Sequence, residues 1–186
     1  MEILIGIIGL VLTILIALIP YFKKKYGDRP KLEIEINMES GSSLPIGLSH
    51  KNDTSNGYIE IVDVIQIFEV QWKMNLRIRN FSDLAAYYTK LSYMTDSPMF
   101  TALDKLPNRP LLNSDEISLK GKYRTFEECR GQERTRTNSI PEKFKDLKIV
   151  LECQNSQGTK FYSIYEHGQI ENRNRHLTKR PKNFRG

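Results

Sequence analysis

The first pattern along the chain is a run of twenty uncharged positions, Ile3–Phe22, sixteen of which are apolar. A helix over this run measures about 30 Å, the hydrocarbon thickness of a bilayer. Glu2 precedes it and Pro20 lies near its end, whereas a cleaved secretory signal has a basic leader and a small-residue cleavage site. A buried soluble helix is the alternative, but this run is apolar on every face. We therefore expect one N-terminal transmembrane α-helix over residues 3–22, followed by a basic linker over residues 23–31.

Basic residues next to the run predict its orientation. Lysine and arginine close to a membrane helix stay on the cytoplasmic side, and here they follow the run. The expected location is the inner cell membrane, single-pass, with the N-terminus outside and the C-terminal domain in the cytoplasm. Aromatic residues beside lysines are typical of the headgroup region. The predicted membrane-interface residues are Tyr21, Phe22, Lys23, Lys24 and Lys25.

Small residues recur along one face of the predicted helix at Gly6, Gly9, Thr13 and Ala17. Helices associate in lipid through close backbone contact at such residues. The stripe therefore predicts a helix–helix interface and a homo-oligomer. The alternative, that glycine is simply common in membrane helices, stays open.

Alternation with a period of two predicts strands in the rest of the chain. Lys31–Asn37 alternates charged and apolar residues, and Phe68–Arg79 places an apolar, aromatic-rich set on one side, as a central core strand does. Turn-forming residues follow at Asn80, after which Ala85–Met94 is expected to return as a strand. Glu39–Gly57 is rich in Ser, Gly, Asn and Asp, which predicts a long loop.

A hairpin is expected near the C-terminal end. Leu147–Cys153 alternates up to a turn ending at Gly158, where glycine can adopt positive φ, and Phe161–Tyr165 returns. Helical periodicity is weak throughout this part. The prediction is an all-β soluble domain over residues 32–170, best described as a two-sheet sandwich, with a small β-barrel as the alternative.

The strand and turn pattern resembles immunoglobulin-like sandwiches of the cell-adhesion-related bacterial type. The resemblance covers about half of the predicted β-domain, and its motifs reflect turns and core alternation. It is carried by Trp72-x3-Leu76-x-Ile78-x-Asn80-x-Ser82-x3-Ala86, Leu111-Leu112-x3-Glu116-Ile117, and Leu147-x-Ile149 to Gly158-x2-Phe161-Tyr162. It implies a fold and no chemistry.

Catalytic and metal-binding motifs do not appear, so an enzyme is the less favoured interpretation and no cofactor or metal is expected. The sequence has no glycine-rich phosphate loop and no Gly-x-Ser-x-Gly motif. His50, His167 and His176 lack ligand-type partners at usable spacing. Cys153 continues an apolar strand face and is expected in the core, while Cys129, in a charged loop near Arg130, is a candidate for a lowered pKa.

Basic residues gather in two places. The first, Lys120–Arg136, is expected to be a loop between strands: either a flexible polar insertion, or a site for an anionic ligand, such as a nucleotide, or for an acidic protein partner. Its candidate binding residues are Lys120, Lys122, Arg124, Arg130, Arg134 and Arg136. The second, residues 171–186, has little apolar content and is expected to be a disordered tail that contacts anionic lipid or RNA.

Net charge supports this division of the chain. The total is +6, yet Lys23–Lys31 contributes +4, Glu171–Gly186 contributes +5, and Leu32–Ile170 is −2. Two functions are consistent with the layout. In the first, the β-domain binds a ligand or partner and reorganises several anchors to perturb the membrane, a layout similar to small bacterial antiviral membrane effectors. In the second, the protein is a non-enzymatic tether or scaffold subunit that recruits cytosolic partners.

Overall fold

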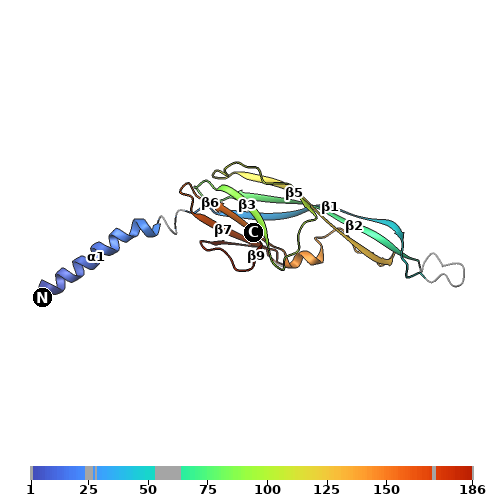
Figure 1. Ribbon diagram of the computed structural model, residues 1–186, viewed down its shortest axis with the longest axis horizontal. Coiled ribbons are helices and arrows are strands. Elements are labelled where there is room, and N and C mark those ends of the chain that lie inside the picture. The colour runs from blue at the N-terminus through green and yellow to red at the C-terminus, as the bar shows by residue number, and fades with distance from the viewer. Residues whose placement is uncertain (1, 24–26, 28, 53–63, 169–170, 186) are drawn as a thin grey trace.

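The computed structural model describes residues 2–23, 27, 29–52, 64–168 and 171–185. One helix, α1 (Glu2–Phe22), comes first, and most of the remaining described chain is strand. The strands form two antiparallel sheets instead of one closed barrel (Figure 1). The main core contains buried side chains from both sheets. The prediction of an all-β domain made of two sheets is confirmed at this level.

The first sheet has the strand order β1-β2-β5-β4. These strands are β1 (Leu32–Leu48), β2 (Ile65–Asn80), β5 (Glu116–Arg130) and β4 (Ala102–Leu103). The strand predicted over Phe68–Arg79 forms most of β2, which lies between β1 and β5 as a central strand should. Its alternate side chains from Phe68 to Ile78 are buried, because the side chains of a strand point to its two faces in turn.

The second sheet has the order β8-β7-β6-β3-β9. These strands are β8 (Arg173–Leu177), β7 (Lys160–Glu166), β6 (Lys148–Gln154), β3 (Tyr87–Met94) and β9 (Phe184–Arg185). The predicted hairpin is confirmed as the β6–β7 pair. In its turn Gly158 has φ of +77°, and Asn155 Oδ1 accepts the N–H groups of Gln157 and Thr159 at 3.1 and 2.9 Å.

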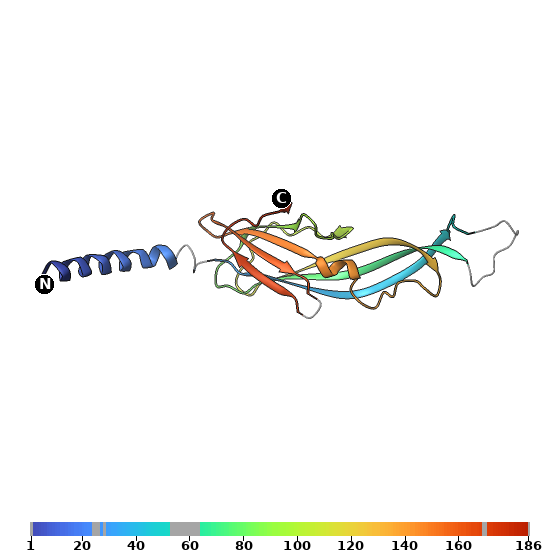
Figure 2. The ribbon, with the colours of Figure 1, turned by 90° about the horizontal axis from the view of Figure 1, so that it is seen from below.

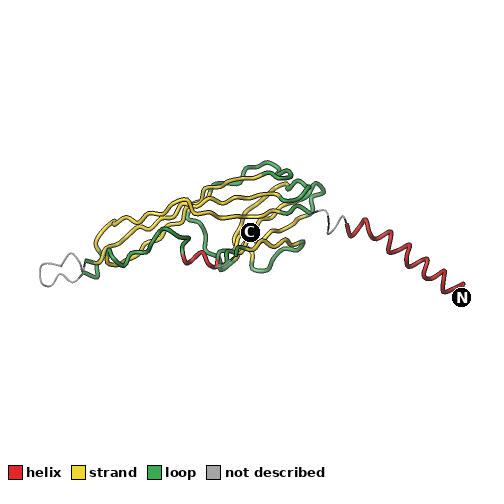
Figure 3. Tube along the Cα trace, turned by 180° about the vertical axis from the view of Figure 1, so that it is seen from behind, coloured by secondary structure: helices red, strands yellow, loops and turns green. Residues whose placement is uncertain are grey.

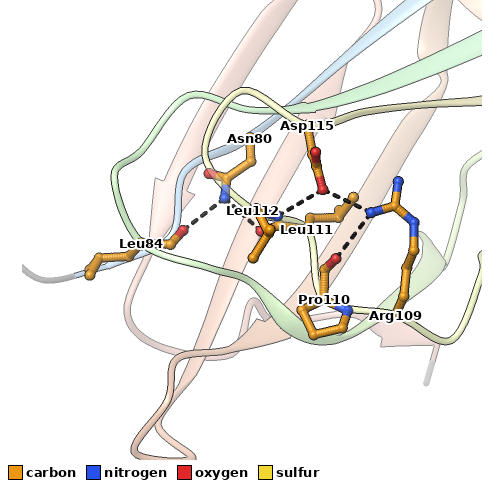
Figure 4. Close-up of polar contacts among 7 residues, drawn as sticks. All are labelled: Asn80, Leu84, Arg109, Pro110, Leu111, Leu112 and Asp115. Carbon is orange, nitrogen blue, oxygen red and sulfur yellow. Dashed lines mark hydrogen bonds and ion pairs between the residues drawn. The ribbon is translucent and has the colours of Figure 1, made fainter.

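The strand expected over Ala85–Met94 forms as β3, but it does not return beside β2. It crosses to the second sheet and pairs with β6. The turn is set by the buried side chain of Asn80, whose Nδ2 donates to the carbonyl oxygens of Leu84 at 2.7 Å and Leu111 at 2.9 Å (Figure 4). These bonds hold the segment after β2 against the segment that precedes β5.

The prediction of a loop over Glu39–Gly57 is wrong for residues 39–48, because β1 continues to Leu48. Residues 53–57 lie outside the described residues. The Ser-Gly-Ser-Ser stretch pairs with β2 through a bulge between Met38 and Ser40. A side chain at Gly41 would overlap the backbone of Thr137, so the small residue permits this close approach.

The loop expected over Lys120–Arg136 is also wrong as far as Arg130. Strand β5 pairs with β2 along nearly its whole length, from Arg79 opposite Glu116 to Ile65 opposite Arg130. Strand β2 supplies backbone hydrogen-bond partners along this segment, and the polar composition of the segment does not reveal that pairing.

The C-terminal prediction of a disordered tail is wrong for the described residues. Strand β8 pairs with β7, and β9 pairs with β3. Asn174 adds a link to the other sheet, because its Oδ1 accepts the N–H of Ile34 and its Nδ2 donates to the carbonyl of Ile34, each at 3.0 Å. An amide used in this way replaces a missing neighbour strand at the edge of β1.

Strands β1, β2 and β5 extend past the second sheet as an arm (Figure 2). Its inner face is covered by the segment that follows β5 and contains the 3-10 helix η2 (Glu142–Asp146). Trp72 Nε1 donates to the carbonyl of Ser139 at 3.1 Å. The ring of Tyr123 lies between those of Trp72 and Phe144, with centroids 5.7 and 4.8 Å away. Near Trp72 the inner face of the arm is thus apolar and covered, whereas farther along the arm Leu44, Leu48 and Phe126 are exposed.

Helix α1 occupies one end of the molecule, away from both sheets (Figures 1 and 3). Its described side chains begin at Gly6, and the large apolar ones among them are exposed. Within the described part of the chain, no helix has the length and apolar character that a membrane crossing requires.

Candidate functional site

The outer face of the first sheet carries a continuous polar and basic surface, which we call the basic face. It is made of three rows of residues that lie side by side across β1, β2 and β5. The rows are Asn37, Asn75 and Lys120; Ser40, Lys73 and Lys122; and Ser42, Gln71 and Arg124. None of the nine side chains is acidic, four are basic, and the other five can form hydrogen bonds.

Strand alternation explains why these residues share a face. On β2, Trp72 and Met74 point into the core, so Gln71, Lys73 and Asn75 must point outward. On β5, Gly121 is buried against the ring of Phe100, and its neighbours are exposed. The same alternation that builds the core therefore builds the basic face.

Two lysines stand directly opposite each other at the centre of this face. Lys73 of β2 is the register partner of Lys122 of β5. Like charges in directly opposed positions destabilise a sheet by roughly 0.2–1 kcal/mol. Among the described residues, neither lysine forms an ion pair. The pairing is unfavourable for the isolated fold, and a bound anion would relieve it.

The next row is different because Arg124 is partly neutralised. Its guanidinium lies 3.4 Å from Glu69 Oε1. The same guanidinium lies 5.8 Å from the centroid of the Phe126 ring, which is 57% exposed. An exposed aromatic ring therefore borders the basic face on the side away from α1.

Acidic side chains appear beside Lys120, where Asp104 Oδ2 accepts the backbone N–H of Lys120 at 2.9 Å, and towards the α1 end of this sheet. Glu116 lies 3.8 Å from Arg77, and Glu35 is the register partner of the same arginine. Positive charge is therefore concentrated in the middle of the sheet face, between ends that are closer to neutral.

The structure brings together half of the predicted anion-binding residues. Lys120, Lys122 and Arg124 lie in line on the basic face. Arg130 has the same strand parity but lies near the tip of the arm, beyond Phe126. Arg134 and Arg136 follow on the segment that turns to the inner face, where Thr137 approaches Gly41.

Lys73 is the member of this site that sequence reasoning missed. Its position in an alternating strand gave its outward direction, but only the register between β2 and β5 places it opposite Lys122. The sequence feature that could have indicated Lys73 is the set of outward-pointing residues of β2 from Gln71 to Arg79, none of which is acidic.

The candidate helix–helix residues lie on an uncovered surface of α1. A side-chain carbon added at Gly6 or Gly9 would meet nothing within 4 Å. Thr13 Oγ1 donates to the carbonyl of Gly9 at 2.8 Å, so its polar group is satisfied inside the helix. Ala17 is exposed on the same helix.

The candidate membrane-interface residues are described only in part. Tyr21 and Phe22 are exposed, and their rings make an edge-to-face contact with centroids 5.7 Å apart. Lys23 is exposed, while Lys24 and Lys25 lie outside the described residues.

The two cysteines differ in burial, and neither has the lowered pKa that a reactive thiol needs. Cys153 is 1% exposed in the core, as predicted, and burial, with a smaller effect of Glu152, raises its pKa to about 12. Cys129 lies on β5 instead of a loop. Burial first, then the charges of Glu127 and Glu133, raise its pKa, so its surroundings do not activate this thiol.

Two histidines form hydrogen bonds to residues of β7 that the sequence did not indicate. Tyr165 Oη lies 3.0 Å from Nδ1 of His167, directly after that strand. Ser163 Oγ lies 3.0 Å from His176 Nδ1, and burial, followed by the charges of Arg29 and Lys31, lowers the pKa of His176. Ser163 is buried, so a substrate cannot reach its hydroxyl. His50 is exposed in a turn, and no cluster among the described residues has the composition of a metal site.

A pocket of about 390 Å³ lies where β3 ends beside η2. Its lining includes Asp96, Asp146 and Lys148, and the ammonium of Lys148 also lies 3.7 Å from Glu166. Charges of both signs give this pocket no clear preference for an anion or a cation. The basic face is therefore the better candidate for a charged partner.

Comparison with known proteins does not assign the chain: no protein-family model, curated protein or solved structure matches it. The immunoglobulin-like resemblance consequently stays a prediction, and function has to be inferred from the residues themselves.

Proposed function

We propose that this protein is a membrane-anchored binding module, in which α1 inserts into the bilayer and the basic face takes an anionic partner in the cytoplasm. The observation that supports it most is the combination of a helix with exposed apolar side chains and a separate two-sheet domain with its own core. The β-domain, in this proposal, is an immunoglobulin-like sandwich.

Exposed apolar side chains on α1 support insertion. Residues from Ile7 to Phe22 present large apolar side chains on all sides of the helix. Each such side chain gains about 1.5–3 kcal/mol when it leaves water. The described side chains of α1 fall short of a membrane crossing by themselves, but the apolar run of the sequence begins at Ile3, before the first described side chain at Gly6, and ends at Phe22, with Lys23 after it. The lysines after the run favour a cytoplasmic β-domain.

The stripe Gly6, Gly9, Thr13 and Ala17 supports assembly of several anchors. Assembly would let partner binding at the β-domains reorganise the helices and perturb the membrane. The protein would then act as a defence effector against viruses. A tether with the same anchor would recruit partners without this effect. The two functions differ in whether membrane integrity depends on the stripe.

The first experiment tests the anchor. We expect the full chain to stay in the membrane pellet after alkaline extraction, and Leu12→Arg combined with Leu15→Arg to release it. Recovery of the unmodified chain in the supernatant would contradict insertion. A membrane-impermeant thiol reagent should label Cys129 only after the cells are permeabilised, and labelling of intact cells would reverse the proposed orientation.

The second experiment separates effector from tether. The size of the full chain in detergent is compared with those of Gly6→Leu and Gly9→Leu, and Val11→Leu serves as a control on the opposite helix face. An effector is expected to be an oligomer that the glycine variants dissociate, and its overproduction should permeabilise the membrane. A monomer, or an oligomer without effect on membrane integrity, would favour the tether.

A further inference from the structure

We propose that the basic face binds single-stranded nucleic acid, with phosphates along Lys120, Lys122, Arg124 and Lys73 and a base against Phe126. This inference rests on the proposed binding function of that face and specifies its ligand class. It is drawn from the spacing of the charges, the opposed lysine pair and the bordering aromatic ring.

The cations on β5 form a row that suits a linear polyanion. Lys120, Lys122 and Arg124 occupy alternate positions, so their Cα atoms are about 7 Å apart along one side of the strand. They are exposed, and a single exposed contact with a phosphate is weak. Useful affinity therefore requires several charges in series on one ligand, which a polymer provides and a mononucleotide does not.

Lys73 widens this row into a surface that phosphates can approach from two strands. It lies opposite Lys122, and adjacent strands are about 4.8 Å apart. One phosphate placed between the two ammonium groups would interact with both and remove their repulsion. Ser40 and Gln71, on neighbouring positions of the same face, offer further hydrogen bonds.

The aromatic ring favours a nucleic acid over an acidic polypeptide. Phe126 is exposed in line with Arg124, whose guanidinium lies near its ring. Bases stack on exposed aromatic rings and guanidinium planes, and only unpaired bases can do so. A flexible single strand can also adjust its phosphate spacing to the row, which a rigid duplex cannot.

The test measures binding of a fluorescent oligothymidylate of roughly 12 nucleotides to the full chain in neutral detergent over a range of salt concentrations. We expect Lys73→Gln combined with Lys122→Gln to weaken binding and to reduce the slope of log affinity against log salt by about 1.4, about 0.7 for each lost contact. Lys90→Gln combined with Lys143→Gln, exposed lysines elsewhere, should leave both unchanged. Phe126→Ala should lower affinity roughly 5-fold to 150-fold without changing the slope.

Competitors distinguish this inference from the more general proposal. Equal binding of a duplex, or tighter binding of polyglutamate, that still depends on Lys73 and Lys122 would overturn the single-strand inference and leave an anionic partner in place. Binding of every probe that is unaffected by the double variant would overturn both. Replacing two opposed lysines should not unfold the protein, which the fluorescence of the buried Trp72 checks in each variant.

Discussion

Asn80 allows a stringent test of what holds the two sheets together. This side chain is 0% exposed and lies at the end of β2. Its Nδ2 donates to the carbonyls of Leu84 and Leu111 (Figure 4). Its Oδ1 accepts the N–H of Ser82 at 3.0 Å and the hydroxyl of Ser82 at 2.8 Å. Asn80→Ala removes all four bonds at once.

The remaining partners set the magnitude. The carbonyl of Leu111 keeps the N–H of Ala86 at 2.9 Å, and the carbonyl of Leu84 keeps the Ser82 hydroxyl at 3.0 Å. The Ser82 N–H, which is partly buried, loses the acceptor described above; a fully buried unsatisfied group costs about 1–3 kcal/mol, so its share lies at the lower end of that range. With the net loss of the other bonds, we expect a decrease in the free energy of unfolding of about 3 kcal/mol.

Urea unfolding of the full chain in mild detergent, followed by the fluorescence of Trp72, measures this decrease. The protein has one tryptophan, and it is buried, so the signal reports on the core. The urea midpoint should fall by roughly 1–3 M. Asn113→Ala is the matched control, because Asn113 is exposed and both of its side-chain contacts are exposed: its Nδ2 donates to Asp83 at 3.4 Å and its Oδ1 accepts the Ser114 hydroxyl at 3.1 Å. If Asn80→Ala lowers the free energy of unfolding by no more than Asn113→Ala does, the Asn80 side chain does not stabilise the fold as described.

Two further predictions concern ionisable groups. The backbone N–H of Leu112, followed by Arg109, lowers the pKa of Asp115, so its contribution to stability is present at neutral pH and is lost as pH falls through this lowered pKa, below the ordinary 3.8. Asp115→Asn should therefore reduce stability at pH 7 but not below the lowered pKa, and an equal reduction at both, in urea titrations, would contradict this. A thiol reagent at mildly alkaline pH should modify Cys129 in the native protein and Cys153 only after unfolding, because Cys153 is buried and has a pKa of about 12; labelling of Cys153 at the rate of Cys129 would show that the core opens locally.

Local alternation predicted the strands whose side chains divide into apolar and polar sets. Phe68–Arg79 and the β6–β7 hairpin are of this kind, because their inward residues are large and apolar. The second half of β1 carries serines and glycine, which do not by themselves indicate a strand. It becomes one because β2 lies beside it and pairs with it. Strand β8 is also polar, so its composition alone indicated disorder, and only its pairing with β7 makes it a strand.

The candidate site follows the same distinction. Lys120, Lys122 and Arg124 could be selected from the sequence because they are close along the chain. Lys73 could not be, because its position opposite Lys122 depends on a pairing between residues that are far apart in sequence. Arg134 and Arg136 are close to these residues in the sequence, but the turn after β5 separates them in the structure.

The hydrogen bonds of the Asn174 amide can form only after most of the chain has been synthesised. It closes the edge of β1 at Ile34, a residue 140 positions earlier in the chain. During synthesis β1 therefore emerges long before the residue that protects it, and its free N–H and carbonyl groups can pair with other chains in the meantime. Proteolytic removal of the C-terminal segment would expose the same edge in the finished protein. Protection of the β1 edge at Ile34 thus depends on β8 reaching the first strand.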